Sequence, residues 1–354
     1  MINRMNMKKF PILSAIIVPI MLFSGCGRKD NSLPRDLISD TARFDSVFMD
    51  ISGWACHELH ALMVVKDGKV VYEKWDHGYD AEHLHVMWSA SKTFTATAVG
   101  FAVQDGLLNV TDKVVNFFSE EELPQVQSDA LKKMTVYDLL IMSSGFKDDC
   151  IGRACSGEDF DWAKATLASE IVFEPGSQFV YNSMNTYLLS VIVSRVTGKR
   201  VDEYLEDKLF APLGIENYMW KQSPQGYSAG GWGLYMRTED FAKMGLFMLQ
   251  KGVWDGERLL NEEWLNDAMS PQIMQYAGQG LTPDDVAKMT PDAWNQGYGY
   301  QMWMCPEGGI RLDGAWAQLC IIYPDKNLVV AAQAYTSNTG GLVQSIQDRI
   351  YGYY

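Results

Sequence analysis

The stretch Ser89-Ala90-Ser91-Lys92-Thr93-Phe94-Thr95 says most about the fold and chemistry of this chain. It opens a run of helix-compatible residues with neither glycine nor proline before Gly100. Residues three positions apart share one face of an α-helix, so the Lys92 ammonium can reach the Ser89 hydroxyl. The partial positive charge and free N–H groups of a helix N-terminus would stabilise an alkoxide and favour a neutral Lys92. We therefore predict that Ser89 is a nucleophile and Lys92 its base.

Two other serines match nucleophile patterns, and both are weaker candidates. Ser144-Gly145-Phe146-Lys147 repeats the spacing, but the glycine and the charged residues after it indicate a helix end that enters a solvated loop. Gly226-Tyr227-Ser228-Ala229-Gly230 matches the Gly-x-Ser-x-Gly elbow, whose histidine partner follows the serine in the chain. All five histidines precede it, and Gly231-Trp232-Gly233 stands where the elbow requires a helix, so we expect a glycine-rich loop there.

The histidines raise the question of a metal site or a histidine base. His57 and His60 are three apart without the glutamate of a His-Glu-x-x-His helix, and His83 and His85 alternate beside a strand-like stretch. His77 stands apart from both pairs. This spacing is poor for metal ligation, so we expect neither a metal site nor a dyad of the nucleophile with His85.

The order of predicted elements indicates an α/β fold. Two β-prone runs flank Asp67-Gly68, which is a hairpin signal, and strand character returns only near the C-terminus. The residues between are mostly helical. A sheet built from both chain ends and interrupted by helices favours an α/β sandwich over a βαβ repeat. We expect one domain at 39–354, with a sheet from about 55–80 and 296–336 and a helical insertion at about 105–295.

The N-terminal residues have the pattern of an export signal. Three basic residues precede an uncharged apolar run, 10–23, that ends in Ser24-Gly25-Cys26. The run is short for a spanning helix, although an uncleaved anchor helix remains the alternative. The ending resembles the lipobox of bacterial lipoproteins, which implies a signal peptide at 1–25, a membrane anchor through lipidation of Cys26, and a polar tether at 26–38. We therefore expect a lipid-anchored protein of the cell envelope, periplasmic or at the outer membrane.

Charge and cysteine content narrow the possibilities further. The formal net charge of −14 is spread along the chain and leaves no basic patch, so nucleic acid is not an expected partner. Five cysteines follow Cys26, so at least one thiol stays unpaired in an oxidising compartment. Cys150 and Cys155 are close enough in sequence for a local disulfide, and Cys320 lies in an apolar run typical of a buried thiol.

Several segments together resemble the class C β-lactamase-like serine hydrolases, a family that also includes esterases, D-aminopeptidases and 6-aminohexanoate-dimer hydrolases. The stretch that begins at Ser89 is the first motif, and the second, Tyr-x-Asn or Tyr-x-Ser, falls on Tyr181-Asn182-Ser183. Further segments occur in the family's order: Leu139-Leu140-Ile141-Met142-Ser143-Ser144-Gly145, Phe173-Glu174-Pro175-Gly176 and Gly230-Gly231-Trp232-Gly233-Leu234. The resemblance covers most of residues 39–340. It implies the fold of β-lactamases and penicillin-binding proteins, an antiparallel sheet flanked by helices with an inserted all-α subdomain.

The resemblance also assigns roles to individual residues. It implies that Ser89 forms an acyl-enzyme and that Tyr181 relays protons with Lys92, whose cation would favour the anionic phenol. Which of Lys92 and Tyr181 is the formal base stays open. Ser183 and Asn185 are implied as oxyanion or substrate-binding residues. The implied substrate is a small molecule or peptide with an amide or ester bond, and no cofactor is required.

The third motif departs from the family's pattern. No Lys-Thr-Gly or His-x-Gly is present, and Arg311-Leu312-Asp313-Gly314-Ala315-Trp316-Ala317-Gln318 stands in its place. It resembles the Asp-Gly-x-x-Gly-Gln form of the amide and ester hydrolase branch, with Ala317 replacing the second glycine. The strand there is expected to supply an oxyanion N–H, from Gly314, Ala315 or Trp316. Without a cationic motif a β-lactam is a less attractive substrate, and Arg311 either substitutes for the cation or faces solvent.

Two alternatives to a hydrolase remain at this point. The altered third motif also suits a lipid-tethered penicillin-binding or peptidoglycan-sensing module that acylates slowly or not at all. A purely structural envelope lipoprotein fits poorly with all three catalytic candidates being present in family order. Four tryptophans beside the motifs are either pocket walls or core residues: Trp88, Trp232, Trp303 and Trp316.

Overall fold

The chain separates into two units, Met1–Asn31 and Ser32–Tyr354, and the elements below belong to the second. The computed structural model describes residues 31–53, 57–156, 161–290 and 292–354. The predicted signal peptide and its lipidation site at Cys26 lie outside these ranges.

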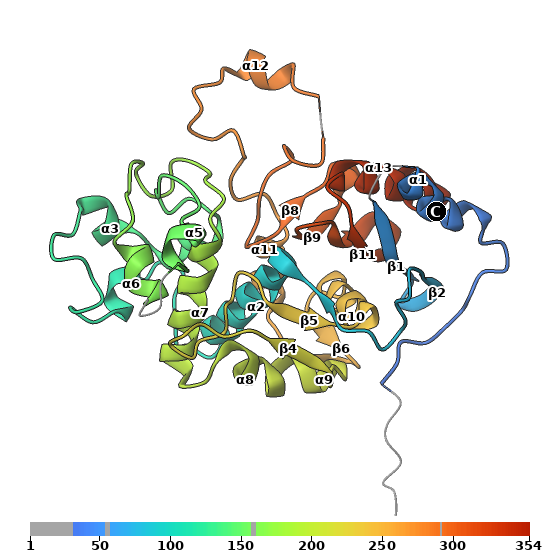
Figure 1. Ribbon diagram of the computed structural model, residues 1–354, viewed down its shortest axis with the longest axis horizontal. Coiled ribbons are helices and arrows are strands. Elements are labelled where there is room, and N and C mark those ends of the chain that lie inside the picture. Colours follow the sequence, from blue (N-terminus) through green and yellow to red (C-terminus); the bar gives the residue numbers. More distant parts are fainter. Residues whose placement is uncertain (1–30, 54–56, 157–160, 291) are drawn as a thin grey trace, which may run out of the picture. The chain divides into compact units, whose positions relative to one another are not determined.

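A six-stranded antiparallel sheet forms the centre of the second unit. Its strand order is β2-β1-β11-β10-β9-β8, so strands from both ends of the sequence lie side by side (Figure 1). The first two strands form the predicted hairpin, because Asp67 and Gly68 both adopt the positive φ angles, 50° and 78°, that a two-residue turn requires. The strand bounds are β1 Glu58–Lys66, β2 Lys69–Trp75, β8 Trp303–Met304, β9 Ile310–Gly314, β10 Gln318–Tyr323 and β11 Leu328–Tyr335.

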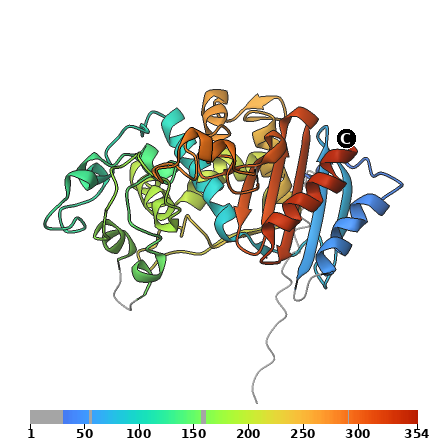
Figure 2. The same ribbon diagram turned by 90° about the horizontal axis from the view of Figure 1, so that it is seen from above.

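Both faces of the sheet are buried, as alternate residues of β11 show. Leu328 and Val330 join the apolar cluster under α1 and α13, whereas Val329 and Ala331 join the larger cluster that includes α2 and α10. Figure 2 shows α1 and α13 lying across the strands. Burial on both faces explains why β11 is a nearly continuous apolar run. The four helices are α1 Ala42–Ser52, α2 Ser91–Gln104, α10 Thr238–Leu249 and α13 Thr339–Arg349.

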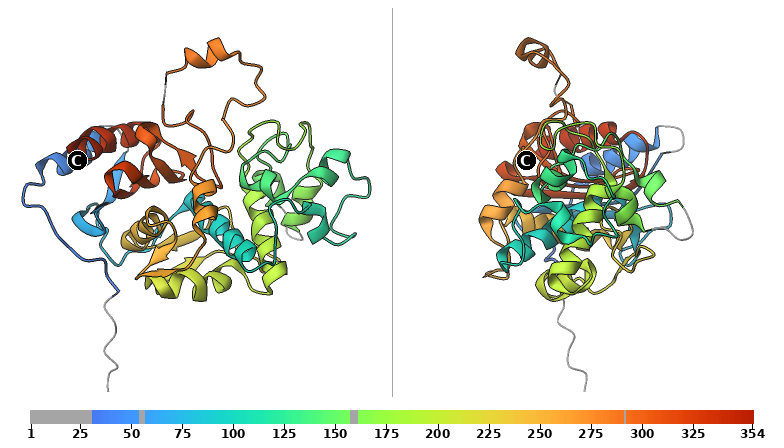
Figure 3. Two further views of the ribbon diagram at one scale, coloured as in Figure 1. Left: turned by 180° about the vertical axis from the view of Figure 1, so that it is seen from behind. Right: turned by 90° about the vertical axis from the view of Figure 1, so that its left-hand side faces the viewer.

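The region between the two halves of the sheet is mostly helical. α7 (Ser183–Thr197) packs against α2, and both helices are buried along most of their length. α12 stands off the rest of the domain in Figures 1 and 3 and contributes no buried residue. The remaining helices are α3 Asp129–Lys133, α4 Val136–Leu140, α5 Ile151–Ala154, α6 Trp162–Leu167, α8 Val201–Leu205, α9 Ala211–Leu213, α11 Glu262–Ala268 and α12 Pro283–Ala287. The short strands are β3 His85–Val86, β4 Tyr218–Trp220, β5 Leu234–Met236, β6 Val253–Trp254 and β7 Glu257–Arg258.

The predicted fold class, an antiparallel sheet flanked by helices with a helical insertion, is confirmed. The short strands β3 to β7 were not predicted, because two or three residues leave no periodic pattern. The sequence also predicts a strand at 298–304 within the 296–336 segment, but only Trp303–Met304 form one. Gln301 has a positive φ of 60°, which interrupts the extended backbone before it.

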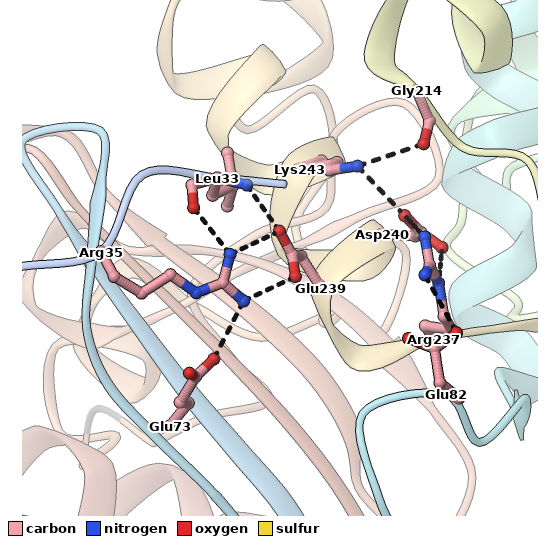
Figure 4. A network of polar contacts seen from close by, with 9 residues as sticks. All are labelled: Leu33, Arg35, Glu73, Glu82, Gly214, Arg237, Glu239, Asp240 and Lys243. Carbon is pink, nitrogen blue, oxygen red and sulfur yellow. Dashed lines mark hydrogen bonds and ion pairs between the residues drawn. The ribbon is translucent and has the colours of Figure 1, made fainter. Parts of the chain in front are cut away.

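The predicted tether, 26–38, is docked onto the domain from Leu33 onward. The N–H of Asp36 donates to the carbonyl of Val70 on β2 at 2.8 Å. Arg35 forms an ion pair with Glu239 on α10 at 2.7 Å, and the N–H of Leu33 donates to the same carboxylate at 2.6 Å (Figure 4). None of the helices in the described ranges has the length and apolar character needed to cross a bilayer.

Candidate active site

Ser89 lies in a 3₁₀ turn, Trp88–Ala90, that leads directly into α2. The N–H of Met87 donates to the carbonyl of Leu234 at 2.9 Å, and the Ser91 hydroxyl donates to the Trp88 carbonyl at 2.6 Å, so the turn is held from both sides. Trp88 has a positive φ of 46°, which is unfavourable for a bulky residue. A strained turn therefore presents Ser89 at the N-terminus of a buried helix.

Lys92 is buried one helical turn after Ser89, and its Nζ has three hydrogen-bond partners. They are Ser89 Oγ at 3.1 Å, Ser183 Oγ at 3.2 Å and the carbonyl of Gly231 at 2.8 Å. Burial lowers the pKa of Lys92 to about 7, against an opposing effect of the Asp149 carboxylate. A lysine that is partly neutral near pH 7 and bonded to a serine hydroxyl can act as a general base.

Tyr181 completes the group around Ser89. Its ring centre lies 5.0 Å from Lys92 Nζ, and its hydroxyl hydrogen-bonds to Ser89. Burial raises the pKa of Tyr181 well above its usual value, and this effect exceeds that of the hydrogen bond. Burial thus opposes the anionic phenol expected from the nearby cation, and a protonated Tyr181 is suited to donate a proton.

The end of β9 lies against the nucleophile turn. A Cβ atom at Gly314 would lie 2.1 Å from the carbonyl oxygen of Met87, so this close approach requires glycine. Trp316 and Ala317 both have positive φ angles, 63° and 64°, and Ala317 is fully buried where the resembling motif has glycine. The Gln318 amide holds the turn by donating to the carbonyls of Ala315 and Trp316, each at 3.2 Å. The predicted oxyanion segment is thus placed beside Ser89.

Ser183 and Asn185 are placed differently, although both are near the start of α7. Ser183 contacts Lys92, as described above, whereas Asn185 is fully buried. The Asn185 Oδ1 accepts from Ser144 Oγ at 3.0 Å, and its Nδ2 contacts Met142 Sδ at 3.8 Å. The structure therefore corrects two expectations: Asn185 is a packing residue rather than a substrate-binding one, and Ser144 is buried rather than in a solvated loop.

Two residues near Lys92 were not predicted as part of the site. The Ser183 hydroxyl donates to Asp149 Oδ2 at 3.0 Å, and no sequence pattern marks Asp149. Gly231 accepts from Lys92 through its carbonyl, and a Cβ atom there would lie 2.6 Å from the carbonyl oxygen of Ser183. The Gly230-Gly231-Trp232-Gly233 run was a usable signal, because a cluster of glycines indicates close backbone approach.

The histidines lie together beside β3. His85 Nε2 contacts His60 Nδ1 at 2.9 Å, and His85 Nδ1 contacts the carbonyl of Val86 at 3.1 Å. Tyr79 stacks on His60 with ring centres 4.0 Å apart. Among the described residues, no group of three or more His, Cys, Asp or Glu side chains is arranged to hold a metal ion. Both ring nitrogens of His85 are thus bonded to groups other than Ser89.

Arg311 is neither a free cation nor solvent-facing. Its side chain is fully buried, its Nε donates to Asp313 Oδ2 at 2.7 Å, and its Nη1 contacts Cys305 Sγ at 3.0 Å. Its guanidinium carbon lies 4.7 Å from the ring centre of Trp294. Of the two alternatives considered for Arg311, the solvent-facing one is wrong, because this ion pair and the tryptophan cover the charge.

The four tryptophans beside the motifs divide into two groups. Trp88 and Trp316 expose 39% and 41% of their surface, one in the nucleophile turn and the other after β9. Trp303 and Trp232 are half-buried, and Trp303 stacks on Tyr181 with ring centres 5.7 Å apart. Aromatic surface therefore borders the serine site on more than one side.

The described cysteines are all free thiols. Cys150 and Cys155 are not joined, so the local disulfide considered from their spacing is absent from the structure. Cys320, in β10, is fully buried as predicted.

Comparison with known proteins agrees with this geometry. The chain is 23% identical over 345 residues to the "Putative D-alanyl-D-alanine carboxypeptidase" of Salmonella agona (strain SL483), covering 75% of this chain and 80% of that protein. Its fold is similar to the "Putative 6-aminohexanoate-dimer hydrolase from Bacillus anthracis", with a TM-score of 0.71, 18% identity, and coverage of 91% and 86% of the two chains. It is also similar to a D-stereospecific amidohydrolase from Streptomyces sp., with a TM-score of 0.67, 16% identity, and coverage of 88% and 99%. The sequence model of the Beta-lactamase family matches residues 51–350. The chain therefore belongs to the beta-lactamase family of serine hydrolases.

Proposed function

We propose that this protein cleaves an amide or ester bond through an acyl-enzyme on Ser89. The observation that carries the proposal is the environment of Lys92. Its Nζ lies 3.1 Å from Ser89 Oγ, and the lysine is only 1% exposed, so burial lowers its pKa to about 7. Such a lysine can accept the serine proton at neutral pH, which a solvated lysine cannot.

The proposed reaction has two steps. Ser89 Oγ bonds to the substrate carbonyl carbon while its proton passes to Lys92, and the N–H of Ser89 with one from Gly314–Trp316 holds the oxyanion. The amine or alcohol then leaves with a proton from Tyr181, which regains one from Lys92. Water then bonds to the acyl carbon and gives a proton to Lys92; the bond between that carbon and Ser89 Oγ breaks, Lys92 returns the proton to Ser89 Oγ, and the carboxylic acid leaves. No cofactor is required.

We favour an uncharged amide or ester, from a small molecule or a peptide, over a β-lactam. A β-lactam carries a carboxylate, which a free cation near the third motif would help to bind. Arg311, the cation in that segment, is held by Asp313 and covered by Trp294. The aromatic surface of Trp88 and Trp316 suits an apolar substrate group.

The test is the intact mass of the protein after treatment with a fluorophosphonate, which bonds to activated serines. We expect one adduct on the wild type and none on Ser89→Ala. Ser144→Ala is the matched control, because it removes the serine of the other Ser-x-x-Lys sequence and should still be labelled. A folded wild type without an adduct, or an adduct that persists in Ser89→Ala, would contradict the proposal.

The alternative, a penicillin-binding or sensing module, has its support in the altered third motif. It predicts a stable penicillin adduct on Ser89 and no turnover of small esters or amides. Rapid turnover of either substrate class would remove it.

We further propose that the protein is anchored in the cell envelope by a lipid on Cys26. The support is the sequence alone: three basic residues, an apolar run at 10–23, and Ser24-Gly25 directly before the cysteine. Metabolic labelling with a radioactive fatty acid should mark the wild type and not Cys26→Ala. Equal labelling of both proteins would contradict the anchor.

A further inference from the structure

The three partners of Lys92 leave open where its lone pair points. A neutral amine has two N–H donors and one lone pair, so two of the partners accept a hydrogen bond and the third donates one. The carbonyl of Gly231 can only accept. The hydroxyls of Ser89 and Ser183, at 3.1 and 3.2 Å, can each donate or accept. Only a lone pair that faces Ser89 can take the nucleophile's proton.

The Asp149 carboxylate decides between the two hydroxyls. Ser183 donates its proton to Asp149 Oδ2 at 3.0 Å, and a carboxylate can only accept. Ser183 must then accept an N–H from Lys92, which leaves the lone pair to Ser89. We propose that Asp149 is a positioning residue that, by holding the Ser183 hydroxyl, directs the lone pair of neutral Lys92 onto Ser89. This inference rests on the proposed function of Ser89 and Lys92.

Asp149 also has a local structural contact that a test must separate from this effect. Its Oδ1 accepts from the N–H of Ile151 at 3.1 Å, at the start of α5. Asp149 is an exposed residue, and its Oδ2 reaches the Ser183 hydroxyl beside the buried Lys92. The titratable groups that face Lys92 are the Asp149 carboxylate and the Tyr181 phenol.

Asp149→Asn separates the two contacts, because asparagine caps a helix start as well as aspartate does. With its oxygen on the N–H of Ile151, the amide presents an N–H to Ser183 and turns that hydroxyl toward Lys92. The lone pair of Lys92 is then taken by Ser183. We expect the rate constant for fluorophosphonate labelling, on its plateau above pH 8, to fall about 100-fold, within the range lost when general base catalysis fails. The acidic limb of the pH profile should also move to lower pH, because the anion that raises the pKa of Lys92 is gone.

A double variant makes the test specific. In Ser183→Ala there is no hydroxyl to turn, so adding Asp149→Asn should cause no further loss of the plateau rate. Asp148→Asn is the matched control, because the neighbouring carboxylate pairs with Arg153 at 2.5 Å instead, and its rate should stay at the wild-type value. Asp149→Ser, another good helix cap but too short to hold Ser183, should lower the rate in the same direction as Asp149→Asn.

The results distinguish this inference from the proposed function. A wild-type plateau rate in Asp149→Asn with no shift of the acidic limb would overturn the positioning role while Ser89 remains the labelled residue. Losses that simply add in the double variant would also overturn it, because they indicate two independent contributions. A folded wild type that is not labelled would overturn both.

Discussion

Acidification should destabilise this protein through the buried pair His60–His85. The hydrogen bond between His60 Nδ1 and His85 Nε2 requires one proton between the two nitrogens, and protonating both rings breaks it. Burial lowers the pKa of His85 from its usual value near 6.5 to about 4, and burial lowers the pKa of His60 as well. Stability from these groups is therefore fully present above pH 6.5 and is lost as the pH falls toward 4.

The magnitude follows from His85 alone. An unfolded chain takes up the proton near pH 6.5 and the folded chain only near pH 4, so at pH 5 the free energy of unfolding falls by about 2 kcal/mol. The full loss below pH 4 is about 3 kcal/mol. The side chain is only 7% exposed, so solvent screening reduces this value little.

Urea unfolding at pH 8 and pH 5, followed by tryptophan fluorescence, measures this loss. His85→Gln retains an amide that can reach His60 but never ionises, so its loss between the two pH values should be about 2 kcal/mol smaller than that of the wild type. His83→Gln, which changes an exposed neighbour, should lose as much as the wild type. An equal loss in His85→Gln and the wild type would refute the reasoning.

Three further predictions concern the site and the docked N-terminal segment. The wild-type rate of fluorophosphonate labelling should be half-maximal near pH 7, where Lys92 loses its proton, and a rate that does not change from pH 5 to 9 would contradict this assignment. Gly314→Ala should lower the labelling rate about 100-fold, because the new Cβ displaces the nucleophile turn by around 1 Å, whereas Gly152→Ala, with no atom within 4 Å of its Cβ, should not. Arg35→Met should lower the free energy of unfolding by about 1 to 2 kcal/mol without changing the labelling rate, because it leaves the half-buried Glu239 without its cation; a thermal melt measures this.

The parts of the fold that were predicted from sequence are those with a local signal. The Asp67-Gly68 turn alone predicts a hairpin. The segments that form β10 and β11 are long apolar runs on either side of a turn, which is the pattern of two paired strands. The pairing of β3 with β5 has no such signal. The two strands are only two and three residues long, and most of the helical region separates them in the sequence. Sheet contacts of that kind depend on tertiary packing, which one sequence does not display.

The candidate site divides in the same way. Ser89 and Lys92 could be paired from spacing because a single helical turn joins them. The contact of Lys92 with Gly231 joins positions 139 apart, and that of Ser183 with Asp149 joins positions 34 apart, so neither has a periodicity to reveal it. For Tyr181 the nearby cation favours the anionic phenol whereas burial raises the pKa, and a sequence does not show how deeply a side chain is buried.

The sheet that combines both chain ends also sets the order of events during synthesis. The Asn327 amide, 260 positions after Asp67, donates a hydrogen bond to Asp67 at the β1–β2 turn. The nucleophile turn packs against Gly314, so it has its neighbouring strand only after Gly314 has been synthesised. A nascent chain therefore carries Ser89 and Lys92 long before the last strands exist to complete the site. Contacts so distant along the chain form late and slowly. The proposed nucleophile therefore gains its neighbouring strand only after the chain has been synthesised beyond Gly314.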